Sequence, residues 1–371
     1  MEAIEKDTFD FTCPTRMIYR PNGVGLIGKI IKEDYHFSKV FLIYGGASLK
    51  KSGAYDKITS SLKENGIDFK EYSGIHANPD ISDVLAILNV AKVYQPELIL
   101  ACGGGSVIDT AKSVANGYYY DGNPLDFNKR IIAPLHALPV ATILTLVASG
   151  SEMSDSCVIS DRAHHFKNGF NSITNRPLFS LLDPTLTYSV PPYQTAMGLI
   201  DMFSHSFERF FSASHPFEPC DNLALSILKS IVEVSSKVMA HPEDYDSRRA
   251  MMICGTLAHN GVTSYGKRFS FPIHQAEHRL SGAYPELTHG QGIALLMPVF
   301  LTLNKAKLTM KIQELGTAVF AVPKESDPEA TIDALKAWLG SFPIYPSFEK
   351  LPFSVDPKDV EKAEQLLLIK A

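Results

Sequence analysis

The chain has 371 residues, of which 45% are hydrophobic and 20% charged, a composition that indicates a folded globular protein and excludes a disordered polymer. Its 35 basic and 40 acidic side chains give a net charge of −5, which argues against a nucleic-acid or anionic-membrane surface. The length suggests about two domains, and the lack of an 18-residue apolar run excludes a transmembrane helix.

The N-terminal residues carry acidic side chains early and no apolar stretch of signal-peptide length, so we expect no secretory or transit signal. The five cysteines are widely spaced and form no C-x-x-C pair, which is typical of reduced thiols in a cytosolic protein. We therefore expect a cytoplasmic protein.

The first half of the chain predicts strands that alternate with helices. Short β-rich runs lie at 39–44, 69–72 and 97–101, and helical spacing of apolar residues marks 54–65, 81–94 and 106–116. Such alternation implies right-handed crossovers and a parallel sheet covered on both faces. Beyond about residue 191 strand signals almost vanish, and helical patterns follow at 193–212, 222–238 and 247–265. We predict an α/β domain over residues 1–188 with a Rossmann-like parallel sheet, and an all-α domain over residues 189–371.

A glycine turn follows the third predicted strand. Gly103, Gly104 and Gly105 come directly before a helix that is expected to open at Ser106. Glycine lets the backbone approach a phosphate closely, and a helix N-terminus presents unpaired N–H groups to it. Ser106 could cap the helix or bond a phosphate oxygen. Because the run is neither G-x-G-x-x-G nor a Walker A loop, a tight turn without a ligand is the alternative.

A second set of polar residues lies in the helical half. Asp201 and His205 are four residues apart, so a helix places them on one face, and His274 and His278 repeat that spacing before His289. Carboxylate and imidazole groups suit Zn²⁺ or Fe²⁺, and two helix-borne pairs can converge on one ion. Spacing nominates both His274 and His278 as ligands. Six further histidines lack such partners and are expected to be ordinary core or surface residues: His136, His164, His165, His215, His241 and His259.

Eight stretches identify a family resemblance. They are YGGASLKKSG (44–53), ANPD (77–80), GGGSVIDTAK (103–112), SGSEMS (149–154), DPTLT (183–187), DMFSH (201–205), LAHNG (257–261) and HQAEH…HG (274–290). Together they resemble the iron-containing (group III) alcohol dehydrogenases, and within them the bacterial butanol dehydrogenase and NADPH-dependent aldehyde reductase branch. The interval from His278 to His289 is one residue longer than in the family pattern, and the chain ends slightly short of the family's last helices.

The resemblance implies a dinucleotide-binding first domain and a metal-binding second domain. Asp201, His205, His274 and His289 would be the metal ligands, and His278 would lie beside the nicotinamide, in the proton path. The pyrophosphate and ribose would be held by Gly104, Gly105, Ser106 and Asp109. The remaining cofactor groove would be lined by Asn78, Thr145, Lys167 and Leu186.

The choice of cofactor can be argued from the turn after the first predicted strand. NAD-preferring relatives carry an aspartate there, which bonds the ribose 2′-hydroxyl. Here Gly45 and Gly46 leave room for a 2′-phosphate, Ser48 can donate a hydrogen bond, and Lys50 or Lys51 can supply positive charge. We therefore predict NADP(H).

The resemblance predicts reversible hydride transfer between primary alcohols and aldehydes, with one divalent metal, Fe²⁺ or Zn²⁺, and commonly a homodimer. Met202, Phe203, Phe271 and Leu280 suggest an apolar pocket for short to medium aldehydes, unless they are plain helix core. The alternatives are a glycerol dehydrogenase or dehydroquinate synthase-like member of the superfamily, a non-catalytic metal- and nucleotide-binding relative, and a metal-dependent hydrolase.

Overall fold

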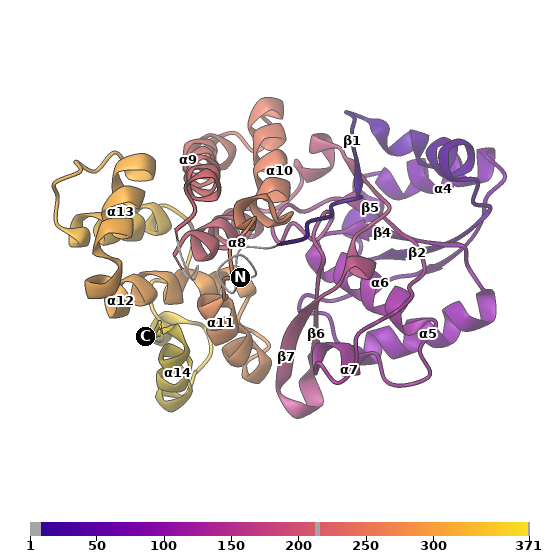
Figure 1. The fold of residues 1–371 in the computed structure, drawn as a ribbon. Helices are drawn as coiled ribbons and strands as arrows, with labels where there is room; N and C mark the ends of the chain where they lie inside the picture. The colour runs from indigo at the N-terminus through magenta and orange to yellow at the C-terminus, as the bar shows by residue number, and fades with distance from the viewer. Residues whose placement is uncertain (1–8, 212–215, 370–371) are drawn as a thin grey trace. The chain divides into compact units, whose positions relative to one another are not determined.

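The computed structural model describes residues 9–211 and 216–369, and the chain divides into two compact units (Figure 1). The first unit spans Thr12–Val190, and the second begins at Pro191 and also takes residues 9–11. Phe11 illustrates this grouping, because its ring packs against Tyr265 with a centroid distance of 4.4 Å. The boundary between the units lies at Val190 and Pro191, residues 9–11 group with the helical unit, and the domain bounds 1–188 and 189–371 stay a prediction.

The first unit is built on a six-stranded parallel sheet with the strand order β1-β8-β5-β4-β2-β3. The strands are β1 (Arg16–Tyr19), β2 (Lys39–Tyr44), β3 (Asp68–Tyr72), β4 (Leu98–Gly103), β5 (Val140–Leu144) and β8 (Phe179–Leu182). β2 and β4 are neighbours, with Val40 opposite Leu98 and Tyr44 opposite Cys102. Both are continuous apolar runs, as expected of strands that are buried on both faces. The predicted α/β fold with a parallel sheet is confirmed.

Helices cover both faces of this sheet (Figure 1). On one face, α2 (Ile27–Lys29) and α4 (Ala54–Glu64) contribute to a core in which Ile58, Leu42 and Leu100 are fully buried. On the other face lie α5 (Ile81–Tyr94) and α6 (Gly105–Gly117), which pack against each other. The short helices α3 (Ser48–Lys51) and α7 (Leu125–Asn128) complete the unit.

Several strands of the first unit were not predicted from the sequence. They are β1, β5, β8 and an antiparallel pair, β6 (Ser156–Asp161) and β7 (Phe166–Asn171), which forms a separate two-stranded sheet. The first three are only four or five residues long. Apolar runs of that length carry too few periods to distinguish a strand from part of a buried helix.

Among the described residues of the second unit, every named secondary-structure element is a helix, which confirms the predicted all-α domain. Its helices are α8 (Pro192–Phe211), α9 (Glu218–Ala240), α10 (Tyr245–His259), α11 (Pro272–Ala283), α12 (His289–Phe320), α13 (Pro328–Gly340) and α14 (Pro357–Glu364). The helix expected to run to residue 265 ends at His259, because Gly261 takes a φ of +105°, which no right-handed helix accommodates. Ser212, the expected end of the first of these helices, lies outside the described residues.

α12 qualifies the exclusion of a membrane-spanning helix. Its length and apolar composition would allow it to cross a membrane, although it contains no uninterrupted apolar run of 18 residues. Within the unit, however, its first turns are core: Leu296, Met297 and Phe300 are fully buried, and the helix packs on α8, α11 and α13. This packing accounts for the apolar composition of its first half.

Candidate metal centre and nucleotide-binding edge

Asp201 and His205 lie on one face of α8, one helical turn apart, as their spacing predicted. Both side chains are almost completely buried, and His205 Nδ1 lies 3.8 Å from Asp201 Oδ1. Met202 and Phe203, the intervening residues that were considered as a pocket wall, are fully buried in the helical core, as is Leu280 of α11. Met202, Phe203 and Leu280 are therefore helix core and not the wall of a substrate pocket.

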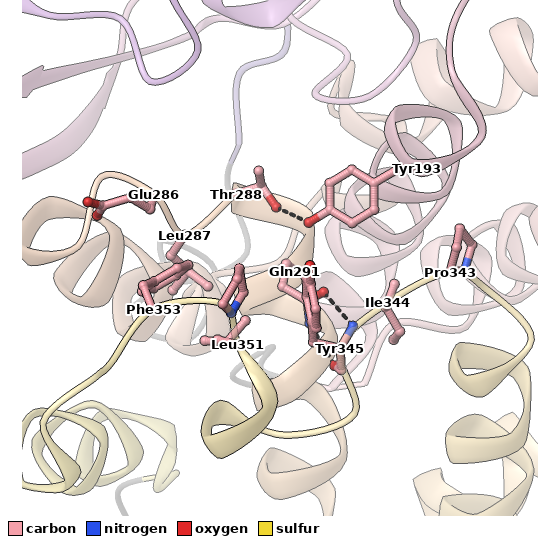
Figure 2. A pocket seen from close by; sticks show the side chains of 11 residues that line it. Tyr193, Glu286, Leu287, Thr288, Gln291, Pro343, Ile344, Tyr345, Leu351 and Phe353 are labelled. Atoms are coloured by element: carbon pink, nitrogen blue, oxygen red, sulfur yellow. Dashed lines mark hydrogen bonds between the residues drawn. The ribbon is translucent and has the colours of Figure 1, made fainter.

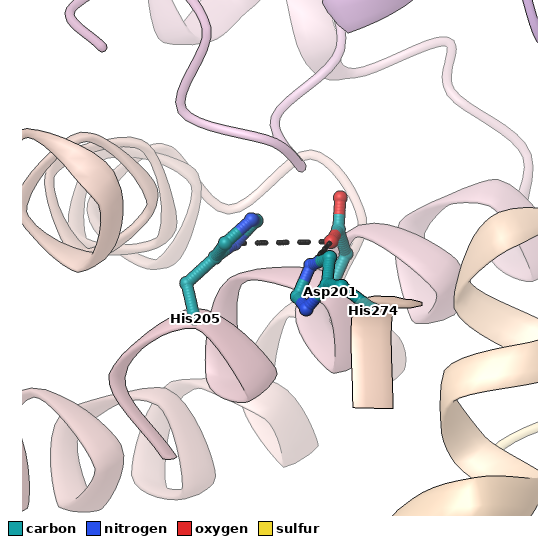
Figure 3. A group of neighbouring side chains, drawn as sticks. All are labelled: Asp201, His205 and His274. Atoms are coloured by element: carbon teal, nitrogen blue, oxygen red, sulfur yellow. Dashed lines mark ion pairs between the residues drawn. The ribbon is translucent and has the colours of Figure 1, made fainter. Parts of the chain in front are cut away.

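Two further histidines reach the same carboxylate oxygen from other helices. His274, in the first turn of α11, places its Nε2 atom 3.7 Å from Asp201 Oδ1. His289, the first residue of α12, places its Nε2 atom 3.5 Å from the same oxygen. Figure 3 shows the side chains of His205 and His274 beside Asp201. Three imidazole nitrogens from three helices therefore surround one buried carboxylate oxygen.

The polar atoms at this point lack the partners that buried groups normally have. Asp201 Oδ1, His205 Nδ1 and His274 Nε2 are all inaccessible to solvent and have no hydrogen-bond partner. An unsatisfied buried donor or acceptor costs about 1–3 kcal/mol, so three of them around one point call for an explanation. A divalent metal supplies it, because imidazole nitrogen and carboxylate oxygen are its usual ligands. The residues present fit the metal that the sequence predicts.

Two buried carboxylates fix the orientation of two of these histidines. Glu208 on α8 hydrogen bonds with His274 Nδ1, and its other oxygen accepts the backbone N–H of Ile273 at 2.6 Å. Glu277 on α11 hydrogen bonds with His289 Nδ1. A carboxylate on Nδ1 leaves Nε2 of the same ring directed at the metal position, an arrangement common around protein-bound zinc.

Burial and neighbouring charges shift the pKa values of this group. Burial alone would raise the pKa of Asp201, but the nearby His205 and His289 side chains hold it well below its usual value. Burial lowers the pKa of His205 well below the ordinary value and keeps the ring neutral. Burial also lowers the pKa of His274, but the carboxylates of Glu208 and Asp201 outweigh that effect and raise it to about 9.

The sequence did not single out Glu208 or Glu277. A signal was nevertheless present, because Glu208 follows His205 by three residues and Glu277 follows His274 by three, so each lies one helical turn from a candidate ligand. Whether such a carboxylate points at its own helix or at a histidine of another depends on how the helices pack. That information is absent from the local spacing.

His278 and His259 are also near the cluster. The ring of His278 lies 5.5 Å from that of His289, and its Nε2 atom is 4.0 Å from Glu277 Oε2. Of the two histidines on α11, His274 therefore approaches the carboxylate of Asp201, and His278 approaches that of Glu277. His259 was expected to have no site partner, which is wrong: its ring centroid is 4.0 Å from that of His205. His215 lies outside the described residues.

The predicted cofactor residues gather at the carboxyl ends of the parallel strands. Gly45 and Gly46 follow β2, Gly104 follows β4, Thr145 follows β5, and Leu186 lies in a short 3₁₀ helix after β8. The chain leaves β2 towards β3 at one edge and leaves β4 towards β5 on the opposite side. Such a reversal creates a crevice at the carboxyl ends of the two strands, where open α/β sheets bind their ligands.

The glycines after β4 have two different roles. A Cβ atom at Gly103 would lie 2.5 Å from the side chain of Val107, and one at Gly105 would lie 2.3 Å from Ser149 Oγ. Packing alone therefore explains both, without a ligand. Gly104 is the N-cap of α6 and no side chain caps the helix, so of the two alternatives for Ser106 the capping role is not the one observed. The N–H groups of the first turn are the feature that suits a phosphate.

Asp109 is buried, and its side chain bonds to groups of the protein. Its carboxylate accepts hydrogen bonds from Ser151 Oγ at 2.6 Å and from the backbone of Val158 at 3.0 Å. Lys112, one turn along α6 and fully buried, donates to Ser151 Oγ at 2.8 Å and to two backbone oxygens of the same loop. These contacts show Asp109 holding the loop that packs against Gly105.

The remaining predicted cofactor residues divide into two groups. Asn78 precedes α5 with a φ of +55°, and its side-chain oxygen accepts a hydrogen bond from Lys167 of β7 at 3.0 Å, so these two residues meet across 89 positions of the chain. Ser48 and Lys51 begin and end α3, directly after the turn that follows β2.

Comparison with known proteins agrees with this arrangement. The chain matches the model for iron-containing alcohol dehydrogenase over residues 14–184, and the model for the C-terminal part of the Fe-containing alcohol dehydrogenase family over residues 195–368. It is 39% identical to NADH-dependent butanol dehydrogenase A of Clostridium acetobutylicum over 86% of this chain and 82% of that protein. It is 30% identical to NADPH-dependent aldehyde reductase YqhD of Escherichia coli over 89% of this chain and 85% of that protein.

A solved structure extends the agreement to the fold. The crystal structure of NADH-dependent butanol dehydrogenase A from Thermotoga maritima superposes with a TM-score of 0.91 at 31% identity, covering 98% of this chain and 90% of that one. The resemblance predicted from eight short motifs is thereby confirmed along nearly the whole chain. On these grounds, the chain belongs to the iron-containing alcohol dehydrogenase family and is an oxidoreductase that acts on alcohols.

Proposed function

We propose that the protein is a metal-dependent, NADP(H)-linked alcohol dehydrogenase that interconverts primary alcohols and aldehydes. The observation that carries the proposal is the convergence of three imidazole nitrogens on Asp201 Oδ1 at 3.5–3.8 Å, with buried polar atoms that lack other partners. We assign Asp201, His205, His274 and His289 as the ligands of one Fe²⁺ or Zn²⁺ ion. The donor set does not discriminate between these two metals.

The preference for NADP(H) rests on the turn after β2. An acidic side chain in this turn would repel a 2′-phosphate, and the turn has Gly45, Gly46 and Ser48 instead. Lys50 Nζ lies 4.7 Å from the ring centroid of Tyr55, so we assign Lys51 as the cation for the phosphate. Relatives of this chain carry names that specify either cofactor, NADH for some and NADPH for others, and the preference is therefore a matter for measurement.

We propose catalytic roles for the side chains on the basis of their positions. A bound divalent metal would polarise the substrate oxygen as a Lewis acid, and the reduced nicotinamide would supply the hydride. Glu208 and Glu277 orient two of the ligand rings through Nδ1. We propose that His278 relays the proton, because an imidazole can both take and give one and its ring lies 5.5 Å from that of His289.

The proposal is tested by following the absorbance of reduced nicotinamide with butanal, using protein loaded separately with Fe²⁺ or Zn²⁺. We expect oxidation of NADPH that requires the metal. Binding of NADPH without turnover, across a series of aldehydes, would instead support a non-catalytic relative. A preference for NADH of about tenfold or more in kcat/KM would contradict the cofactor assignment.

The role of His278 has its own test. We expect His278→Ala to lower kcat by about 10²–10⁴ while the metal content stays at the wild-type level. His274→Ala is the matched comparison on the same helix, and it should lose the metal. If metal were lost from the His278→Ala protein as well, His278 would be a ligand.

We also propose a cytoplasmic homodimer, on the grounds of the free cysteines and the usual state of the family. Light scattering on the purified protein tests the oligomeric state.

A further inference from the structure

His205 lacks the support that the other two proposed histidine ligands have. Carboxylates hydrogen bond with the Nδ1 atoms of His274 and His289. His289 has further support, because the hydroxyl group of Thr288, the preceding residue, lies 2.7 Å from that of Tyr193 on α8 (Figure 2). In the part of the chain that the structure describes, His205 Nδ1 has no hydrogen-bond partner. The ring of His205 must therefore be held in another way.

The orientation of a histidine ring is not fixed by its own side-chain geometry. Rotation about the bond between Cβ and the ring has broad minima, so the ring can turn at small cost. Such a turn would move the nitrogen of His205 away from its present place, 3.8 Å from Asp201 Oδ1. Because metal ligands have to be held close to one geometry, a contact with the ring itself is required.

His259, the last residue of α10, supplies such a contact. Its ring centroid lies 4.0 Å from that of His205, and the two ring planes meet at 78°, so the edge of one ring packs against the face of the other. The ring of Phe271 flanks both, at 6.1 Å from that of His259 and 6.2 Å from that of His205. Rotation of the His205 ring would therefore bring it into the ring of His259.

Arg209 ties together the backbones that carry these two rings. It lies one turn after His205 on α8, and its buried guanidinium donates hydrogen bonds to the carbonyl oxygens of His205 at 3.1 Å and of Ala258 at 2.9 Å. Ala258 directly precedes His259. The guanidinium also lies 4.9 Å from the ring centroid of Phe271. The end of α10 is thus fastened to α8 at the point where the rings meet.

We propose that His259 is a positioning residue of the metal centre, which holds the ring of His205 in place by packing against it. The Nδ1 atom of His259 has no hydrogen-bond partner among the described residues, as expected of a packing contact. His259 is not itself a ligand in this arrangement. The group around Asp201 whose ligand atoms all lie within 4.8 Å of one another consists of Asp201, His205 and His274. The inference rests on the proposed function, because it takes His205 as a ligand.

The test measures metal affinity by chelator competition and the absorption spectrum of the Co²⁺-substituted protein, neither of which requires turnover. His259→Leu removes the flat ring but fills most of its volume. We expect it to weaken metal binding by about 10- to 100-fold and to shift the ligand-field bands of Co²⁺. His259→Phe keeps an aromatic ring against His205 and should retain the wild-type affinity and spectrum. If the leucine variant fails to fold, His259→Met tests the same loss, because methionine adapts to irregular space.

Met251→Ala is the control for a general loosening of the helical unit. Met251 is buried on the same helix as His259, and its truncation should leave metal affinity and the Co²⁺ spectrum as in the wild type. Wild-type affinity and spectrum in His259→Leu would overturn the inference. So would a loss of affinity in His259→Phe or Met251→Ala equal to that in His259→Leu.

His205→Ala separates this inference from the proposed function. If that variant keeps the full metal affinity, His205 is not a ligand, and the metal assignment of the proposed function fails. If it loses the metal, the assignment stands, and the His259 variants decide the inference by themselves.

Discussion

Gly290 lies where the candidate metal centre has least room. It follows His289 in α12, and a Cβ atom on it would lie 2.6 Å from the carbonyl oxygen and 2.8 Å from the Cα atom of Met197 on α8. These are backbone atoms, so no rotamer change can relieve the contact. Ordinary contact begins at 3.4 Å, so Gly290→Ala must separate the two helices locally by about 0.8 Å, the difference between 3.4 and 2.6 Å.

That separation acts directly on the ligand set. Met197 is one helical turn before Asp201, and His289 Nε2 lies 3.5 Å from Asp201 Oδ1, so the displacement is a substantial fraction of the distance between the two ligand atoms. Overpacking of this kind costs about 1–3 kcal/mol of stability. Disturbance of ligand orientation weakens metal binding by about 10- to 100-fold. We expect both effects in Gly290→Ala.

Urea unfolding of the metal-free protein measures the first effect, and competition with a chelator measures the second. Gly340→Ala is the matched control, because a Cβ atom at this last residue of α13 meets nothing within 4 Å. The control should change the free energy of unfolding by less than about 0.5 kcal/mol. If the two variants behave alike in both measurements, the close approach of α8 and α12 does not constrain the centre, and our reasoning is refuted.

Three further predictions concern buried polar groups. Glu277→Gln should weaken metal binding by about 10- to 100-fold in chelator competition, because Glu277 orients the ring of His289. The exposed Glu233→Gln is the control and should leave metal affinity unchanged. Equal metal affinities of the two variants would contradict the role of Glu277 in positioning His289. Lys112→Met should lower the free energy of unfolding by about 2–4 kcal/mol, because three oxygens lose their donor, and urea unfolding beside the exposed Lys57→Met checks this. Burial raises the pKa of Cys102 and Cys157, so both thiols stay protonated at mildly alkaline pH. They should react with a disulfide reagent only after unfolding, and rapid labelling of all five cysteines in the folded protein would show otherwise.

The sequence predicted best those elements whose signal is local. The predicted bounds of β2 and α5 agree with the structure to the residue. Both elements have local end signals: Gly45 follows the apolar run of β2, and Asp80 caps the start of α5. The short strands β5 and β8 escaped prediction because their burial is set by neighbouring strands. Long-range pairing of this kind has no local signature.

The same distinction applies to the candidate site. The i, i+4 spacing predicted that Asp201 and His205 share a face, and the contact between them follows from helix geometry alone. The choice between His274 and His278 could not be made from spacing, because both lie on α11 and only the packing of α11 against α8 decides which ring reaches Asp201. The hydrogen bond of Glu208 to His274, across 66 residues, has the same origin.

The origin of the ligands in three separate helices has a consequence for the integrity of the unit. An ion held by His205, His274 and His289 would close loops of 69 and 15 residues, counted from the sequence positions. Tying such loops restricts the unfolded chain in the way that a disulfide does, by an amount that grows slowly with loop length. The five cysteines of this protein are all unpaired, so the chain itself supplies no covalent cross-link. The ion would then act as a reversible cross-link, and the stability of the helical unit would depend on the concentration of free metal.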